Sequence, residues 1–199
     1  MYQIGVLVGS IRNPRCCPQI AEFIVNRLKA EHEGTSSINF NIIDLQKQNL
    51  PFYDEPGIPA MIKDPMQYEH EHTRRWSKLI SAQDGFIFVS PQYNWGYPAG
   101  LKNAIDYLSN EWKEKKATVV TYGSHGGDKC NEQLTQVLTG IGLEVTSKTV
   151  QLSFPNRDIL FKAAQGENIN IENGKVFESS YDDISESFEE LVALISNKT

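Results

Sequence analysis

The sequence predicts an α/β fold in which a five-stranded parallel sheet is covered by helices on both faces. Short, β-branched apolar runs alternate along the chain with segments whose apolar residues recur at helical spacing. Crossovers between parallel strands are right-handed, and the doubly wound strand order 2-1-3-4-5 satisfies that rule. The expected strands cover residues 2–9, 38–45, 85–90, 117–123 and 143–152.

Apolar residues at helical spacing mark the expected helices. They are Ile20, Phe23, Ile24 and Leu28; Trp76, Leu79 and Ile80; Leu101, Ile105 and Leu108; Leu134, Val137, Leu138 and Ile141; and Ile184, Phe188, Leu191, Val192 and Ile195. The Pro-rich stretch 51–65 has no repeat period and is expected to be a loop. The pair Asn173 and Gly174 lies between two short alternating runs within residues 169–177, which predicts a small hairpin or an extended excursion.

Length and composition narrow the class of protein. At 199 residues we expect one domain, spanning residues 1–199. Acidic residues outnumber basic ones by 25 to 19 and the basic ones are scattered, which argues against a nucleic-acid or membrane partner. No apolar stretch reaches membrane-spanning length and no targeting segment precedes the first strand, so we expect a cytoplasmic protein. Cys16, Cys17 and Cys130 lack metal-binding spacing, so reduced thiols and no metal site are predicted.

Loop one (residues 9–18) follows the first expected strand and reads GSIRNPRCCP. It matches neither GxGxxG nor the GxxxxGK[ST] phosphate loop, so it lacks the signatures of dinucleotide-binding folds and nucleotide kinases. It nevertheless offers what an anion needs: the Ser10 hydroxyl, the charges of Arg12 and Arg15, and the N-terminus of the next helix. The alternative is a solvated turn with surface arginines.

Loop three (residues 91–100) follows the third expected strand and reads PQYNWGYPAG. Tyr93, Trp95 and Tyr97 offer flat faces, and Gly96 exposes backbone N–H and C=O groups. Such a loop suits a planar heteroaromatic ligand, whose ring packs on the side chains while fixed amides bind its edge. The alternative is an aromatic cluster that packs over the end of the sheet.

Loop four (residues 121–130) follows the fourth expected strand and reads TYGSHGGDKC. Gly123 and Gly126 let the backbone approach a ligand closely, and Ser124 and His125 are polar groups at the tip of the loop. His125 is either a proton donor or a solvated loop histidine. The absence of an evident carboxylate partner in the sequence favours the second role.

The predicted topology brings these three loops together, because ligands of doubly wound sheets bind at the carboxyl ends of the strands near the switch point. Loop one then provides a phosphate site, and loops three and four hold a flat ring between them. A phosphorylated planar cofactor of this shape is flavin mononucleotide (FMN).

The same residues resemble a known family. GSIR in loop one, PQYNWGYPAGLKNAIDYL beginning in loop three and YGSHGG in loop four resemble the NADPH-dependent FMN reductase family. Its members have a flavodoxin-like fold and include flavin, quinone, azo and chromate reductases. The likeness covers roughly residues 3–150 and is greatest to the fungal FMN-dependent quinone reductases.

The resemblance implies a cofactor site made by all three loops. In such a site loop one holds the phosphate, loop three holds the isoalloxazine ring largely through its backbone, and loop four flanks the pyrimidine edge. The implied residues are Ser10, Arg12, Pro91, Gln92, Tyr93, Asn94, Trp95, Gly96, Gly123, Ser124, His125 and Gly126. Gln92 stands where many members have Glu. Asn13, Cys16 and Cys17 stand where many have further phosphate ligands, and that part of the site stays open.

The implied activity is hydride transfer from NADPH or NADH to flavin N5, followed by reduction of a quinone, flavin or azo acceptor at the same ring face. Because donor and acceptor use the same ring face in turn, ping-pong kinetics are implied. The reaction takes place at the flavin and needs no catalytic side chain. A homodimer is expected. Two other classes are kept open: a flavodoxin-like electron carrier, and an interaction module whose partner binding depends on the flavin state. The acceptor and the choice between NADH and NADPH are not decided by the sequence.

Overall fold

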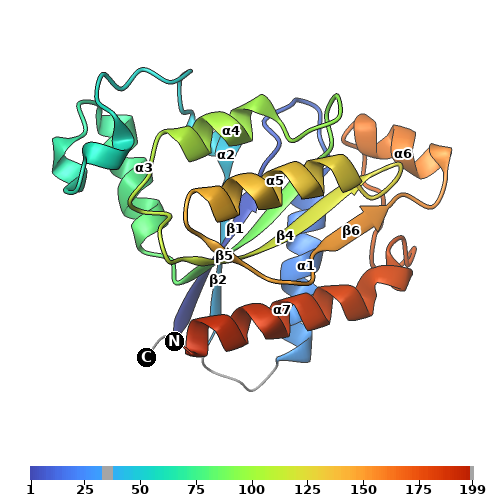
Figure 1. The fold of residues 1–199 in the computed structure, drawn as a ribbon. Coiled ribbons are helices and arrows are strands. Elements are labelled where there is room, and N and C mark those ends of the chain that lie inside the picture. The colour runs from blue at the N-terminus through green and yellow to red at the C-terminus, as the bar shows by residue number, and fades with distance from the viewer. Residues whose placement is uncertain (33–37, 198–199) are drawn as a thin grey trace.

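The computed structural model describes residues 1–32 and 38–197. Within these residues the strands form one parallel sheet of order β2-β1-β3-β4-β5, with β6 also paired to β4 (Figure 1). The strands are β1 (Tyr2–Val8), β2 (Ile38–Asp44), β3 (Gly85–Pro91), β4 (Lys116–Gly123), β5 (Glu144–Val145) and β6 (Val150–Ser153). The predicted doubly wound, flavodoxin-like strand order is confirmed.

The fifth predicted strand, residues 143–152, is in fact two strands. β5 pairs with the start of β4, at Lys116 and Ala117, whereas β6 pairs with its last four residues. Between them the Ser147 and Lys148 N–H groups donate to the carboxylate of Glu190, at 2.7 and 3.2 Å. The chain leaves the ladder there, and a side chain of the last helix accepts the backbone N–H groups of the break.

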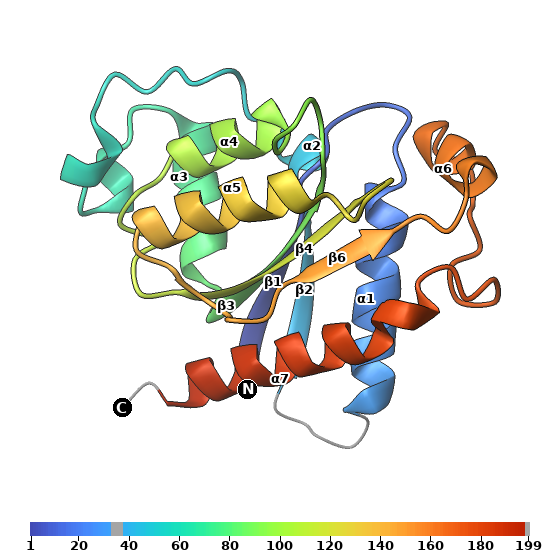
Figure 2. The ribbon, with the colours of Figure 1, turned by 45° about the vertical axis from the view of Figure 1, so that its right-hand side comes forward.

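Helices cover both faces of the sheet (Figures 1 and 2). The core on one face contains residues of α1 (Cys17–Glu31) and α7 (Tyr181–Ser196), and the core on the other contains residues of α3 (Glu71–Ser81), α4 (Ala99–Asp106) and α5 (Asp128–Gly140). Within β1, Val6 and Val8 pack in the first core and Leu7 in the second. The continuous apolar runs therefore reflect burial on both sides, as predicted.

Several short elements were not predicted. They are α2 (Leu45–Gln48), α6 (Arg157–Ala164) and the 3₁₀ turns Pro59–Met61, Pro65–Gln67 and Glu178–Ser180. Of the two alternatives for residues 169–177, the hairpin is wrong, because residues 171–177 form turns and no strand pairing occurs in this stretch. Its buried apolar side chains, among them Ile169, Ile171 and Phe177, all pack in the core beside α1. The apolar alternation reflects this anchoring and not a pleated strand.

No helix within residues 1–32 and 38–197 is long and apolar enough to span a bilayer. Cys16, Cys17 and Cys130 are buried and unpaired.

Candidate functional site

The carboxyl ends of β1, β3, β4 and β6 lie at the same edge of the sheet, and backbone hydrogen bonds join the loops that leave them (Figure 2). The Gly9 N–H donates to the Val89 carbonyl at 2.8 Å, which ties loop one to β3. The Gln92 N–H donates to Tyr122 at 3.2 Å, which ties loop three to β4. The parallel register therefore brings the predicted loops together.

A cavity of about 170 Å³ lies between these loops and is here called the loop cavity. Its lining residues are Arg12, Arg15, Cys16, Pro91, Gln92, Tyr93, Tyr122, Gly123, Phe154, Leu160, Ala163 and Ala164. Five of the predicted site residues line it: Arg12, Pro91, Gln92, Tyr93 and Gly123. Contributions from loops one, three and four to one cavity are what the topology predicted.

Ser10 joins loop one to loop three. Its side chain is fully buried, and its Oγ lies 2.8 Å from the Tyr93 hydroxyl. The same oxygen accepts the Arg12 N–H at 3.3 Å. Ser10 therefore holds the start of loop three and the turn of loop one in a fixed relation.

Arg15 is engaged by the protein itself. Its Nη1 and Nη2 each donate to one oxygen of the Asp44 carboxylate at 2.8 Å, and they also donate to the Ser10 carbonyl and to Gln46 Oε1. Burial alone would raise the pKa of Asp44, but the hydrogen bonds and charge of Arg15 outweigh it and lower that pKa. This guanidinium is a clamp between loop one and the end of β2.

Arg12 differs from Arg15 because it has no carboxylate partner among the described residues. Its Nε donates to the Pro14 carbonyl and its Nη2 to the Ala164 carbonyl, both at 3.0 Å. Its guanidinium carbon lies 5.6 Å from the centroid of the Tyr93 ring. Of the two loop-one arginines, Arg12 is the one whose charge is available to an anion in the loop cavity.

Loop three forms a tight hairpin. Tyr93 and Gly96 exchange backbone hydrogen bonds of 2.8 and 3.0 Å, and the two residues between them, Asn94 and Trp95, have φ values of 45° and 73°. Two positive φ values are typical of a type I′ turn, which normally takes Asn-Gly. Trp95 is 68% exposed, so its ring does not belong to an aromatic cluster packed over the end of the sheet, which was the alternative for this loop. A bulky residue in this conformation is strained, and such strain collects at functional sites.

Gln92 caps α5 from a distance. Its Oε1 accepts the N–H groups of Lys129 and Cys130 at 2.9 and 3.1 Å. The residue before α5 is Gly127, which has no side chain to do so. Gln92 lies far from Lys129 and Cys130 in the sequence, so no local capping motif indicates this contact. The sequence analysis did not predict it.

Loop four contributes less to the cavity than predicted. Ser124 and His125 are exposed, with Ser124 Oγ and His125 Nδ1 3.1 Å apart. Gly126 has a φ of 70° and is buried against β6, where a Cβ would lie 2.7 Å from the Cβ of Gln151. Among the four residues predicted in this loop, only Gly123 lines the loop cavity.

Sequence reasoning also missed one side of the cavity. Leu160, Ala163 and Ala164 come from α6, which the sequence analysis did not predict. The signal was present: Asn156 caps the helix by accepting the Ile159 N–H, and Gly166 follows its end. Asn before a helix and Gly after it are the usual start and stop residues.

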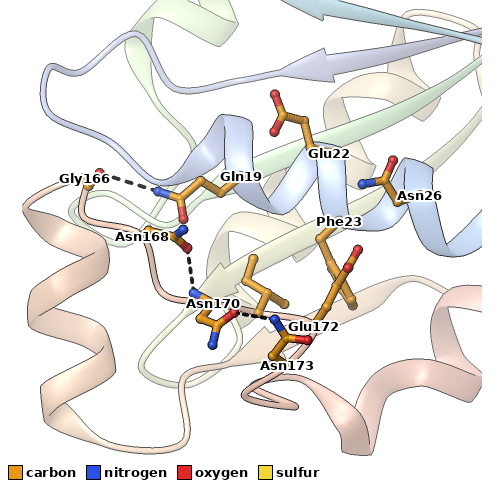
Figure 3. A pocket seen from close by; sticks show the side chains of 10 residues that line it. Gln19, Glu22, Phe23, Asn26, Gly166, Asn168, Asn170, Glu172 and Asn173 are labelled. Carbon is orange, nitrogen blue, oxygen red and sulfur yellow. Dashed lines mark hydrogen bonds between the residues drawn. The ribbon is translucent and has the colours of Figure 1, made fainter.

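A larger groove of about 440 Å³ lies elsewhere, between α1 and residues 166–173 (Figure 3). Gln19 and Asn26 line it from α1, and Asn168, Asn170 and Asn173 line it from the facing segment. Figure 3 shows hydrogen bonds between Gln19 and Gly166 across the groove, and between Asn168 and Asn170 and between Asn170 and Asn173 within the segment. The groove marks where the segment lies along α1, and none of the predicted site residues lines it.

The family of this chain follows from its similarity to known proteins. The family model described as NADPH-dependent FMN reductase matches residues 2–156, which is most of the chain. The chain belongs to the NADPH-dependent FMN reductase family. This FMN reductase is 46% identical over 146 residues to an NAD(P)H-dependent FMN reductase of Saccharomyces cerevisiae, covering 72% of this chain and 76% of the relative.

Two further comparisons agree. A quinone reductase of Escherichia coli is 27% identical over 152 residues, covering 73% of this chain and 74% of that one. A solved flavoenzyme NAD(P)H:(acceptor) oxidoreductase of Paracoccus denitrificans has the same fold, with a TM-score of 0.62, 23% identity and coverage of 96% and 99% of the two chains. The expected family and enzyme class are confirmed. The cofactor of this FMN reductase is FMN, and its electron donor is NADPH or NADH.

The residues of the loop cavity suit FMN chemically. Arg12 supplies a cation without a carboxylate partner in the described chain, beside the N-terminus of α1. Loops three and four supply a rigid hairpin and the backbone of Gly123 at the other end. Ligand pockets usually measure about 300–1,000 Å³. The loop cavity is smaller than this range.

Proposed function

We propose that this reductase binds FMN between loops one, three and four and uses it to carry a hydride from NAD(P)H to a quinone or a similar flat acceptor by a ping-pong mechanism. When bound, FMN supplies the chemistry of hydride acceptance and donation. The observation that carries the proposal is the single cavity lined together by Arg12, the Tyr93 hairpin and Gly123.

The residues of the chain bind and orient the cofactor. Arg12 binds the phosphate, while Ser10 keeps Tyr93 in place through the 2.8 Å contact between their hydroxyl oxygens. Gln92 keeps loop three against the start of α5. Fixed orientation of the reacting ring lowers the barrier, because donor and acceptor then meet in a reactive geometry. No side chain of the loop cavity needs to act as a nucleophile.

The surroundings of the hairpin suit a flat acceptor. A groove of about 730 Å³ next to loop three is lined by Tyr97, Phe52 and Tyr53, and Trp95 stands exposed at the hairpin tip. Aromatic faces bind planar molecules with little selectivity for their substituents. Together with the quinone reductase relative, this supports quinones, with flavins and azo compounds as further acceptors.

We propose a homodimer formed through the face that carries residues 51–67. Phe52, Ile58, Met61 and Met66 are between 69% and 88% exposed there. A concentration of exposed large apolar side chains in one segment favours an interaction site there. Light scattering of the purified protein should give twice the chain mass, and Phe52→Glu should shift it toward the monomer. A wild-type monomer would exclude the dimer.

The cytoplasm is the location that we propose. The support is that all three cysteines are unpaired, as thiols are in a reducing compartment. Fractionation of the source cells, with the protein followed by antibody, tests this directly.

Two measurements test the function. Purified protein should show the visible absorption of bound flavin, and mass spectrometry of the released ligand should identify FMN. Added quinone should then be reduced at the expense of NADPH or NADH. Bound FMN without any NAD(P)H oxidation would favour the electron carrier, and stoichiometric FAD would contradict the proposed site.

A further inference from the structure

We propose that α6 and the turn after it, residues 157–166, form one side of the FMN site, where they hold the phosphate-binding Arg12 in position and close the cavity around the cofactor. The proposal rests on the FMN site proposed above. The family match ends at residue 156, so these residues lie beyond the part of the chain that the match describes.

α6 contributes directly to the loop cavity. Leu160, Ala163 and Ala164 line it opposite the loops, and Ala163 is buried. Loop one and α6 also lie side by side in both ribbon views (Figures 1 and 2). Without α6, the predicted phosphate end of the cavity would be open to solvent on this side.

The end of α6 fixes the direction of the Arg12 guanidinium. Nη2 donates to the carbonyl of Ala164, the last residue of α6, and Nε donates to Pro14. Within the described chain no acceptor is bound to Nη1, which therefore keeps both its N–H groups for a ligand. A guanidinium held by two protein acceptors loses less conformational freedom when it binds an anion, and such preorganisation raises affinity.

The turn after α6 is fitted closely against loop one. Gly166 has a φ of 70°, and a Cβ at this position would lie 2.9 Å from the Cβ of Pro14 and 3.0 Å from the backbone nitrogen of Arg15. The turn thus approaches loop one at a distance that only glycine allows.

Gln19 of α1 holds this turn from outside the cavity (Figure 3). Its Nε2 donates to the carbonyls of Gly166 and Glu167, at 3.5 and 2.9 Å, and its Oε1 accepts the Ile169 N–H at 3.3 Å. Gln19 does not line the loop cavity. Its side chain can therefore be removed without touching the proposed FMN contacts.

α6 is only partly buried, although Ile159 and Leu160 also pack against the core beside α1. Only Ala163 of its eight residues is buried, and Phe161 is 61% exposed. Segments with so little burial open at low free energy. A cofactor that binds only the closed arrangement must stabilise it, and any loosening of the arrangement must weaken cofactor binding by the same factor.

The first experiment is hydrogen exchange of the intact protein, followed by mass spectrometry, without and with saturating FMN. Amides of residues 159–166 should exchange about tenfold more slowly with FMN, as closure coupled to binding requires. Amides at the C-terminal end of α7, remote from the loop cavity, serve as the internal control. Unchanged or faster exchange in residues 159–166 would overturn the proposal.

The second experiment compares Gln19→Ala with Asn26→Ala, two amides on the same face of α1 of which only Gln19 bonds to the turn. Fluorescence titration should give a dissociation constant for FMN about fivefold or more higher in Gln19→Ala, within the usual range of coupling between sites. Asn26→Ala should match wild type. Equal affinities in the two variants would overturn the proposal, whereas a wild-type protein that binds no FMN would contradict the proposed function itself.

Discussion

Arg15 and Asp44 form a two-bond ion pair between loop one and the end of β2, with N–O distances of 2.8 Å and side chains that are 10% and 9% exposed. The pair separates the roles of the two arginines that the sequence placed together at an anion site. Arg15 is neutralised within the protein, whereas Arg12 has no carboxylate partner among the described residues and is the arginine that we propose to bind the phosphate.

The first prediction follows from this division. Arg12→Ala should weaken FMN binding about tenfold or more at unchanged stability, because a charge-assisted hydrogen bond contributes about 1.5–3 kcal/mol. Arg15→Ala should instead lower the free energy of unfolding by about 3 kcal/mol, since it leaves the Asp44 carboxylate buried without its partner. Fluorescence titration and urea unfolding of both variants measure the two effects. A loss of stability in Arg12→Ala together with weakened FMN binding in a stable Arg15→Ala would contradict these separate roles.

The second prediction concerns acid stability. The pKa of Asp44 is lowered in the folded protein, although burial acts in the opposite direction. Such a group stabilises the fold above its unfolded-state pKa of about 3.9, and that contribution is lost as the pH falls through the lower folded-state pKa. The free energy of unfolding should therefore fall more steeply below about pH 4 in wild type than in Asp44→Asn.

The control for the Asp44→Asn measurement is Asp106→Asn, which removes an exposed carboxylate paired with Lys102. Exposed pairs contribute little, so this variant should follow the wild-type curve. Parallel acid transitions in wild type and Asp44→Asn would show that the Arg15 pair does not govern acid unfolding.

The third prediction tests the remote cap of α5. Gln92→Leu leaves the Lys129 and Cys130 N–H groups without their acceptor and should cost about 1–2 kcal/mol of stability. Gln92→Glu keeps the acceptor and adds a charge that a helix N-terminus favours, so stability should be retained. If Gln92 serves FMN by positioning loop three, binding should fail in the Leu variant and persist in the Glu variant. Equal stability of the two variants would mean that the cap is of no energetic importance.

The fourth prediction concerns the strained hairpin. Trp95→Gly should stabilise the protein by about 1 kcal/mol, because glycine adopts a φ of 73° without steric cost. The same change should raise KM for quinones, since it removes an exposed aromatic face beside the ring site. Asn94→Gly is the matched control and should gain less, because Asn tolerates positive φ. Lower stability of Trp95→Gly with unchanged quinone kinetics would assign the Trp95 ring to packing alone.

The fifth prediction is kinetic. If donor and acceptor use one face of the cofactor in turn, both cannot be bound there together, and double-reciprocal plots at several fixed quinone concentrations should be parallel lines. Intersecting lines would show that donor and acceptor bind at the same time at separate places, which the shared-face mechanism forbids.

Much of the fold follows from local patterns of residues. The runs in β1, β3 and β4 are apolar throughout because both faces of the sheet are buried, and the helices carry one apolar face because each covers one side. Right-handed crossovers leave few possible strand orders, and the observed doubly wound order is one of them. The meeting of loops one, three and four at one edge is then a consequence of topology, and so is the position of the candidate site.

Contacts between distant residues were decided only by the tertiary structure. Asp44 pairs with Arg15, Glu190 accepts backbone N–H groups between β5 and β6, and Gln92 caps a helix that begins at Asp128. Such side-chain hydrogen bonds satisfy backbone or charged groups across long sequence separations and leave no period in the sequence. For this reason the sequence by itself determined the elements, their order and the loops that form the site, whereas the partner of each polar group in those loops was determined by three-dimensional packing.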